Sequence, residues 1–428
     1  MLTKRKNYLF IHNSFIIFTL LLFTEGILRK WFTNSYAIEL IILRDSIIVI
    51  CIIYAFKNQI LDFKQKLEKI LLLITLLIIF WSLIQLIITE TTVTISIIGL
   101  RNWLIFYWFV VIFYKSLDYG DLGFILKLLT ITFIPIVLLA YIQFLSPVES
   151  VINKGVDGGF IFQVVDGVVR PSSIFTFTYG YNQYLAFLAP IILGLISLKG
   201  KFNISSKKKL LLLFFLLFAV LTCGSRSIII YSAFLFVTYF YLNLFNFNSI
   251  SINIGKILIL IISYFLIINF LNEYFEIIFS RFETAAVQED VFSRVIQMVL
   301  GSQNTWENYS IFGEGLGAAS NMARPFLNTR NFYLGEFDSD RMLNEGGTLG
   351  ILFLCVKPIF ILILFSKCSQ IKLISYERYI FSILILIFLV YQLMLSSITG
   401  QVTSHAFFIL GLCMFFVLSK TNDNLDKK

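Results

Sequence analysis

Long apolar runs separated by short polar connectors recur along the whole 428-residue chain. Each run has roughly 20 residues, the length that an α-helix needs to cross a bilayer. The pattern predicts an all-α, polytopic membrane bundle that forms one integral membrane domain over residues 1–428. We expect about twelve spans, near residues 8–24, 36–56, 69–89, 93–114, 122–145, 181–198, 209–224, 227–245, 254–271, 347–366, 379–397 and 404–419. The first run has no small-residue cleavage site, so it is expected to stay as a span.

Composition agrees with this class. Only 14% of the residues are charged, whereas a soluble domain carries about 25%. The net charge of +9 is spread over short connectors, so no nucleic-acid partner is expected. The five cysteines all lie in or beside apolar runs, which predicts buried thiols and no disulfide framework. The chain shows no zinc-type His/Cys cluster and no calcium loop, so neither a metal nor a cofactor is expected.

Basic connectors set the predicted topology. An even number of spans places both termini on one side, and the positive-inside rule identifies that side as cytoplasmic. The supporting residues are Lys4, Arg5, Lys6, Lys57, Lys64, Lys66, Lys69, Lys199, Lys201, Lys207, Lys208, Lys209, Lys367, Lys372, Arg378, Lys420, Lys427 and Lys428.

Two long connectors, about 146–180 and 272–346, then face outward. Connectors of this length are usually functional or disordered, and these are rich in aromatic and β-branched residues. A helix is expected at about 284–300, with an apolar face formed by Phe292, Val295, Ile296 and Val299, and with Gly301 as its stop. Gly313, Gly315 and Gly317 predict a tight turn that brings the loop onto the bundle.

Arginine replaces lysine on the predicted outer face. Arginine offers a planar fork that grips phosphate or carboxylate with two bonds, which favours an anionic ligand there. Some of these arginines could instead pair with loop carboxylates. Lys30 and Lys154 are the obvious outer lysines, and the outer arginines are Arg29, Arg170, Arg226, Arg281, Arg294, Arg324, Arg330 and Arg341.

Three arginines stand out by position. Arg226 lies at the seam between two apolar runs, where a charge is costly and usually functional. Arg101 is predicted to be buried in the fourth span, where it could line a path for an anionic lipid or pair with an acid elsewhere in the bundle. Arg44 and Asp45 in the second span could neutralise each other or other groups.

Four segments together resemble the bacterial O-antigen polymerase and O-antigen ligase superfamily. They cover most of residues 160–360, and their order and shared side carry the resemblance. They are Arg170–Phe175 followed by Tyr179–Ala186 and Pro190; Leu221–Ser227; Arg294–Trp306 continuing into Phe312–Gly317; and Asp338–Gly350.

The resemblance implies a glycosyltransferase in the bacterial cytoplasmic (inner) membrane. Its donor would be a saccharide on undecaprenyl pyrophosphate, joined to an acceptor on the outer face of the membrane. Preorganised cations stabilise a departing pyrophosphate, so Arg170 and Arg226, followed by Arg294, are the expected catalytic cations. Arg101, Arg341, Tyr181 and Asn182 are expected to bind substrate. A chain-length regulator and a flippase are expected as partners by analogy.

The residue that activates the acceptor hydroxyl is left open. Asp338, Asp340 and Glu345 lie where the long loop re-enters the membrane, and each is a candidate base. Asp338 could instead cap the next helix, and Arg341 could form an ion pair with Glu345. Ligases of the superfamily usually carry a histidine in the large outer loop, and this loop has none.

That departure favours a polysaccharide repeat-unit polymerase over a ligase. A lipid-linked oligosaccharide flippase or another transporter is the alternative from a different class. Transporters often show inverted halves and broken helices, and neither pattern is visible in this sequence.

Overall fold

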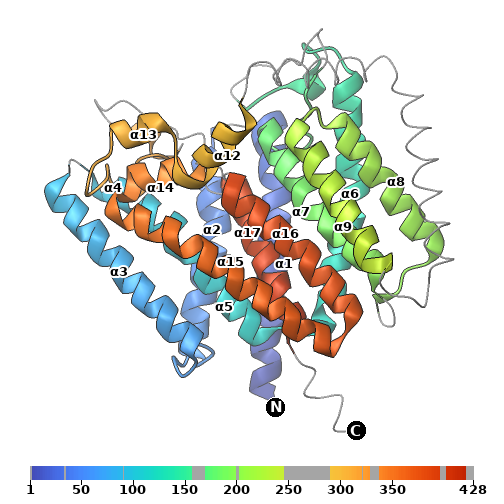
Figure 1. Ribbon diagram of the computed structural model, residues 1–428, viewed down its shortest axis with the longest axis horizontal. Coiled ribbons are helices and arrows are strands. Elements are labelled where there is room, and N and C mark those ends of the chain that lie inside the picture. Colours follow the sequence, from blue (N-terminus) through green and yellow to red (C-terminus); the bar gives the residue numbers. More distant parts are fainter. Residues whose placement is uncertain are drawn as a thin grey trace.

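The computed structural model describes residues 2–32, 35–89, 91–156, 169–198, 202–244, 290–320, 322–327, 337–395 and 402–420. The secondary-structure elements in these ranges are all helices, which confirms the all-α class (Figure 1). The helices of the first half are α1 (Leu2–Ile27), α2 (Ala37–Lys57), α3 (Lys66–Ile88), α4 (Val93–Leu100), α5 (Phe106–Ser116), α6 (Leu122–Leu145) and α7 (Thr178–Ser197).

The second half continues the same pattern, with short helices inserted before the last three long ones. Its helices are α8 (Ser206–Thr222), α9 (Arg226–Leu244), α12 (Val291–Leu300), α13 (Gln303–Glu307), α14 (Asp338–Gly346), α15 (Thr348–Ile374), α16 (Tyr376–Leu395) and α17 (Val402–Leu418). Two π-helical turns, Leu28–Phe32 and Arg101–Ile105, extend α1 and join α4 to α5.

Seven helices in the described ranges are long and apolar enough to cross a membrane. They correspond to seven of the predicted spans, near residues 8–24, 69–89, 93–114, 122–145, 181–198, 347–366 and 379–397. α2, α8, α9 and α17 form helices where spans were predicted but fall outside that set. The span predicted at 254–271 lies outside the described residues.

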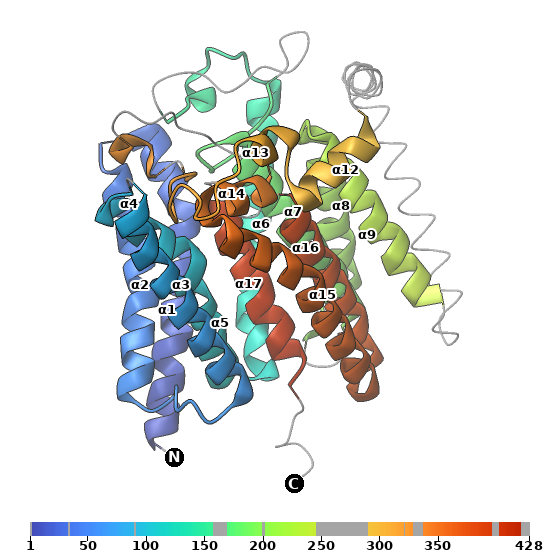
Figure 2. The same cartoon turned by 60° about the vertical axis from the view of Figure 1, so that its left-hand side comes forward.

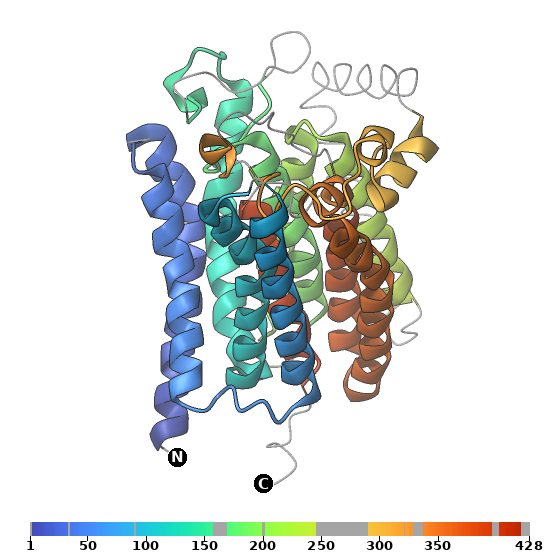
Figure 3. The ribbon, with the colours of Figure 1, turned by 90° about the vertical axis from the view of Figure 1, so that its left-hand side faces the viewer.

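The long helices run side by side, and the short helices α12, α13 and α14 lie at one end of the bundle (Figures 2 and 3). The start of α1, the 58–65 connector and the last turn of α17 lie at the opposite end from α12, α13 and α14 (Figures 2 and 3). We call these the terminal end and the α14 end. The lysine-rich segment 57–66, which was predicted to be cytoplasmic, thus lies at the terminal end.

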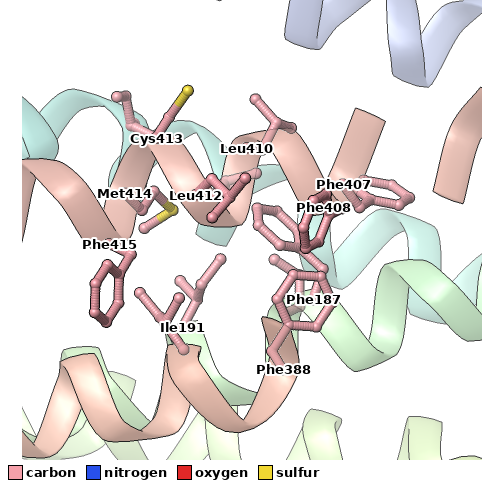
Figure 4. Packing of buried hydrophobic residues seen from close by; sticks show 14 of the residues in the cluster. Phe187, Ile191, Phe388, Phe407, Phe408, Leu410, Leu412, Cys413, Met414 and Phe415 are labelled. Atoms are coloured by element: carbon pink, nitrogen blue, oxygen red, sulfur yellow. The ribbon is translucent and has the colours of Figure 1, made fainter. Parts of the chain in front are cut away.

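The core is centred on α7. In its membrane-length window, 94% of the residues are buried, whereas the corresponding windows of α3 and α15 are 17% buried. Phe187 of α7 packs against Phe388 of α16 and Phe407 of α17, with ring centroids 5.6 and 5.2 Å away (Figure 4). α3 and α15 expose leucine and isoleucine side chains, as helices that face lipid do. α7 is therefore an interior helix of the bundle, and α3 and α15 lie at its periphery.

The second long loop contains more structure than the sequence predicts. The expected helix is present as α12, and Gly301 with φ +93° ends it, which confirms the predicted stop. Residues 284–289 of that prediction lie outside the described residues. The apolar side chains of α12 are exposed, including Phe292 at 74%. α13 and α14 are further helices in the same loop, and the first loop ends at Phe177, where α7 begins.

Candidate functional site

The segment that carries Arg170 is held by buried polar side chains from two helices. The Nζ of Lys30 donates to Ser172 Oγ at 2.7 Å and to the Ser173 carbonyl at 2.8 Å. The Oε1 of Gln143 in α6 accepts from the amides of Ser172 and Ser173 at 3.1 and 2.6 Å. Lys30 is only 2% exposed. A lysine predicted to lie in an outer connector is instead a buried anchor of the Arg170 segment.

Backbone geometry completes this anchor. Ser173 has φ +49°, a strained value for a residue other than glycine, and its Oγ donates to the Ile136 carbonyl at 2.6 Å. Phe175, two residues later, packs against Tyr184 of α7 with ring centroids 5.3 Å apart. Arg170 therefore projects from a fixed segment.

Arg226 lies within electrostatic range of Arg170. α8 ends at Thr222, Gly224 turns the chain with φ +65°, and Arg226 is the first residue of α9. Burial lowers the pKa of the Arg170 guanidinium, and the nearby Arg226 charge lowers it further. The Nε of Arg170 is buried with no hydrogen-bond partner among the described residues. We call these two residues the arginine pair, and the structure brings them together from segments more than 50 positions apart.

Tyr181 and Asn182 are buried in the first turns of α7. They are 0% and 3% exposed, so neither belongs to a solvent-facing loop. Tyr181 interacts electrostatically with Cys223, which precedes the turn into α9. The Tyr181 hydroxyl and the Asn182 Oδ1 have no hydrogen-bond partner within the described ranges. The sequence singled out both residues, and the structure buries both of them in the bundle.

A second group of charges is centred on α14. Arg341 is 1% exposed and donates to Asp338 Oδ1 at 3.1 Å and to Glu345 Oε2 at 2.7 Å. Lys357 of α15 donates to Asp338 Oδ2 at 2.7 Å. Trp103 Nε1 donates to Glu345 Oε2 at 2.7 Å. These five residues form the α14 cluster, and the Arg341–Glu345 ion pair foreseen from their spacing is confirmed.

Asp338 does not cap a helix. It is the first residue of α14, a helix separate from α15, and its carboxylate pairs with Arg341 and Lys357. Burial alone would raise the pKa of Asp338, but these two cations outweigh burial and hold that pKa below its ordinary value. The possibility that Asp338 is an N-cap is therefore wrong, because ion pairing uses both of its oxygens.

The cap is supplied by Asp340 instead. Its Oδ2 accepts from the amide of Phe337 at 3.3 Å. Its Oδ1 accepts from the Ser302 amide at 2.6 Å and from Thr305 Oγ1 at 2.8 Å. Both oxygens are thus engaged in fastening the segment before α13 to α14, which weighs against Asp340 as a base.

Arg101 belongs to a third group of buried charges. It pairs with Asp45 through Nε, and Arg44 bonds the same carboxylate at 3.2 Å. Arg44 also donates to Glu25 Oε2 at 2.7 Å, and Glu25 in turn pairs with Arg29. We call these five residues the α2 network. Arg44 and Asp45 do neutralise each other as expected, but Arg101 sits in a π-helical turn and its Nη2 has no partner among the described residues. Such turns often occur at functional sites.

Arg294 lies apart from the arginine pair. Its guanidinium is 6.0 Å from the centroid of the Phe337 ring, at the start of α14. Its guanidinium therefore lies beside the residue that precedes α14. Of the other arginines predicted on the outer face, Arg281 and Arg330 lie outside the described residues.

The glycine-rich turn rests on the bundle as predicted. Gly313, Gly315 and Gly317 all have positive φ, and Gly315 packs against Thr91. Gln85 of α3 links the turn to α14: it accepts from the Leu316 amide at 3.0 Å and donates to the Glu345 carbonyl at 2.7 Å. The turn thereby braces α14 from the side of α3.

Sequence analysis missed Lys357 and Gln143. A lysine within an apolar run is the one clear signal, because a charge there needs a partner. The glutamine gave no comparable signal, since its partners come from a distant segment.

Comparison with protein-family models, with curated proteins and with solved structures finds no match to this chain. The chemistry therefore rests on the site itself. Two close guanidinium groups on a fixed scaffold suit a phosphate or pyrophosphate, and the carboxylates of the α14 cluster are mostly committed to cations.

Proposed function

We propose that this chain is a polysaccharide repeat-unit polymerase of the bacterial cytoplasmic membrane. It would join undecaprenyl-pyrophosphate-linked oligosaccharides at the α14 end, which would face outward, with both termini in the cytoplasm. The observation that carries the proposal is the arginine pair. The Arg170 and Arg226 charges interact despite their like sign, and the segment that carries Arg170 is braced by Lys30 and Gln143.

The charge arrangement fits a departing pyrophosphate. Like charges held together in a partly buried site are unfavourable without an anion, and they stabilise an anion strongly where water is scarce. Of the described acidic side chains, none pairs with Arg170. The resemblance of the Arg170, Arg226 and α14 segments to the O-antigen polymerase and ligase superfamily points to the same chemistry.

The proposed topology has about twelve spans, with two outer loops that carry Arg170 and α12–α14. Lysine-rich segments at the terminal end support this orientation through the positive-inside rule. A chain-length regulator and a flippase are the partners that such a polymerase would need.

A genetic experiment tests the proposal. The gene is deleted in its host, and surface and lipid-linked glycans are separated on a gel. The deletion is then complemented with wild type, with Arg170→Ala or with Arg226→Ala at matched membrane levels. We expect the polymer ladder to collapse to a single lipid-linked repeat and only wild type to restore it. Arg324→Ala, at an exposed arginine, serves as the matched control.

Other outcomes separate the alternatives. Full-length polymer that remains on its lipid carrier would indicate a ligase. Repeat units trapped on the cytoplasmic leaflet would indicate a flippase. An unchanged glycan profile would refute any role in glycan assembly.

A further inference from the structure

His405 occupies a buried position in the first turns of α17. It is 3% exposed, and its ring packs edge-on against Phe106 of α5 with centroids 4.7 Å apart at 80°. Tyr107 and Phe408 pack around the same ring at 6.0 and 6.4 Å. Aromatic side chains thus fix the orientation of the imidazole.

Charged groups from three other elements face this ring. His405 interacts electrostatically with Arg341 and Asp338 of α14, with Arg101 of the π-helical turn and with Arg44 of α2. Tyr107 interacts with the same two α14 residues. His405 therefore lies between the α14 cluster and the α2 network.

Neither ring nitrogen of His405 has a hydrogen-bond partner among the described residues. A buried polar atom without a partner is destabilising, so such atoms are uncommon unless they serve a ligand or a reaction. A neutral imidazole always has one nitrogen able to accept a proton. By contrast, the carboxylates of Asp338 and Asp340 have both oxygens engaged, and Glu345 has only Oε1 unoccupied.

The same turn of α17 also contacts the segment that carries Arg170. Phe407, two residues after His405, packs against Phe175 of that segment at 5.9 Å and against Tyr184 of α7 at 5.8 Å. The first turns of α17 thus lie between the arginine pair's segment and the α14 cluster. In a direct displacement at a sugar carbon, the hydroxyl attacks the carbon on one side and the leaving group departs from the opposite side. Cations for the one and a base for the other are needed on opposite sides as well.

We propose that His405 is the general base that deprotonates the acceptor hydroxyl; this inference rests on the proposed polymerase function. The acceptor oxygen forms a new bond to the anomeric carbon of the donor sugar as its proton passes to a His405 ring nitrogen. The bond from that carbon to the pyrophosphate oxygen breaks, and the electron pair leaves with the lipid pyrophosphate. The imidazolium then returns the proton to the released pyrophosphate.

The test uses the purified full-length chain in lipid nanodiscs. The substrate is the lipid-linked repeat unit extracted from a strain that lacks the gene. The pH dependence of kcat/KM is measured for wild type and for His405→Gln, which keeps a polar side chain but cannot carry the proton. We expect a loss of about 10²–10⁴-fold and the disappearance of the acid limb of the wild-type profile.

Two variants control for packing. His12→Gln changes the other histidine, which packs against Phe124 of α6 at 5.2 Å and lies outside the proposed site. Phe408→Leu loosens the packing beside His405 but leaves the proton acceptor intact. Both should keep the acid limb. Thermal midpoints and gel-filtration profiles of all variants show whether each one is folded.

The outcomes separate this inference from the function on which it rests. If wild type makes no polymer from the extract, the polymerase function fails. If wild type polymerises and folded His405→Gln keeps its rate and acid limb, only the base assignment is overturned. Loss of the acid limb in Glu345→Gln, with its retention in His405→Gln, would assign the base to Glu345 instead.

Discussion

The arginine pair and the α14 cluster lie at the same end of the bundle, but they differ in the signs of the charges that they bring together. In the α14 cluster, Arg341 and Lys357 face two carboxylates at 2.7–3.1 Å. In the arginine pair, Arg226 adds positive charge near Arg170, whose Nε has no partner among the described residues. The α14 cluster matches each cation with a carboxylate, whereas two neighbouring guanidinium groups are suited to bind an incoming anion. Changes in the pair should therefore reduce activity, and changes in the cluster should reduce stability.

The largest effect is expected from replacing the arginine pair. Arg170→Ala and Arg226→Ala should each lower the polymerisation rate by about 10²–10³-fold, because each removes a preorganised cation from the departing pyrophosphate. Lysine at either position should restore only part of the rate, since it keeps the charge but loses the planar fork. Rates are measured with lipid-linked repeat units in nanodiscs. Unchanged rates in both alanine variants would remove the distinction between the two regions.

Breaking the α14 cluster should mainly affect stability. Arg341→Met leaves Asp338 and Glu345 without their shared cation, and removal of one partner from a buried pair costs about 3–5 kcal/mol. The thermal midpoint in detergent should fall clearly below that of wild type. Arg324→Met, at an exposed arginine of the same end, should leave the midpoint nearly unchanged. Equal midpoints for both variants would show that the cluster does not hold α14.

A smaller effect is expected from the anchor of the Arg170 segment. Gln143→Leu removes the acceptor of the Ser172 and Ser173 amides, at about 1–3 kcal/mol for each buried group left unpaired. Hydrogen exchange of these two amides should accelerate, and the polymerisation rate should fall while the global midpoint changes little. Gln303→Leu, whose side chain is exposed on α13, is the matched control. Unaltered exchange would show that Lys30 alone fixes the segment.

The smallest effect should appear in the pH dependence of stability. The pKa of Asp338 is held below its ordinary value by Lys357 and Arg341, against the opposing effect of burial. Its stabilising contribution is therefore complete above the unfolded pKa of about 3.9 and is lost as the pH falls through the lower folded value. Thermal midpoints are compared from pH 7 to pH 3 for wild type and Asp338→Asn. Wild type should lose stability more steeply below about pH 5, and parallel curves would contradict this linkage.

Local patterns predicted much of the fold. The apolar periodicity located the long helices, and the amphipathic run before Gly301 located α12. The Arg341–Glu345 pair follows from helical spacing, because residues four apart share a face. Each of these depends on neighbours in the chain, which the sequence displays directly.

Such local patterns do not predict contacts between segments that are distant in the sequence. The sequence around Asp338 is compatible with an N-cap. In the structure, Lys357, 19 residues away on the next helix, binds the Asp338 carboxylate instead. Lys30 was expected in an outer connector, yet it binds serines 142 and 143 positions later. Neither pairing leaves a periodic trace, since a buried cation can be satisfied by any correctly placed oxygen.

The sequence by itself determined the helical membrane class, the positions of the long helices and the arginine-rich segments, because hydropathy and charge act residue by residue along the chain. Only the tertiary structure decided which buried charges neutralise one another and which like charges lie within electrostatic range of each other. It brought Arg226 to Arg170, and it placed His405 between two charged groups. The physical reason is that ion pairing depends on distance in space, and packing of the bundle sets that distance independently of separation in sequence.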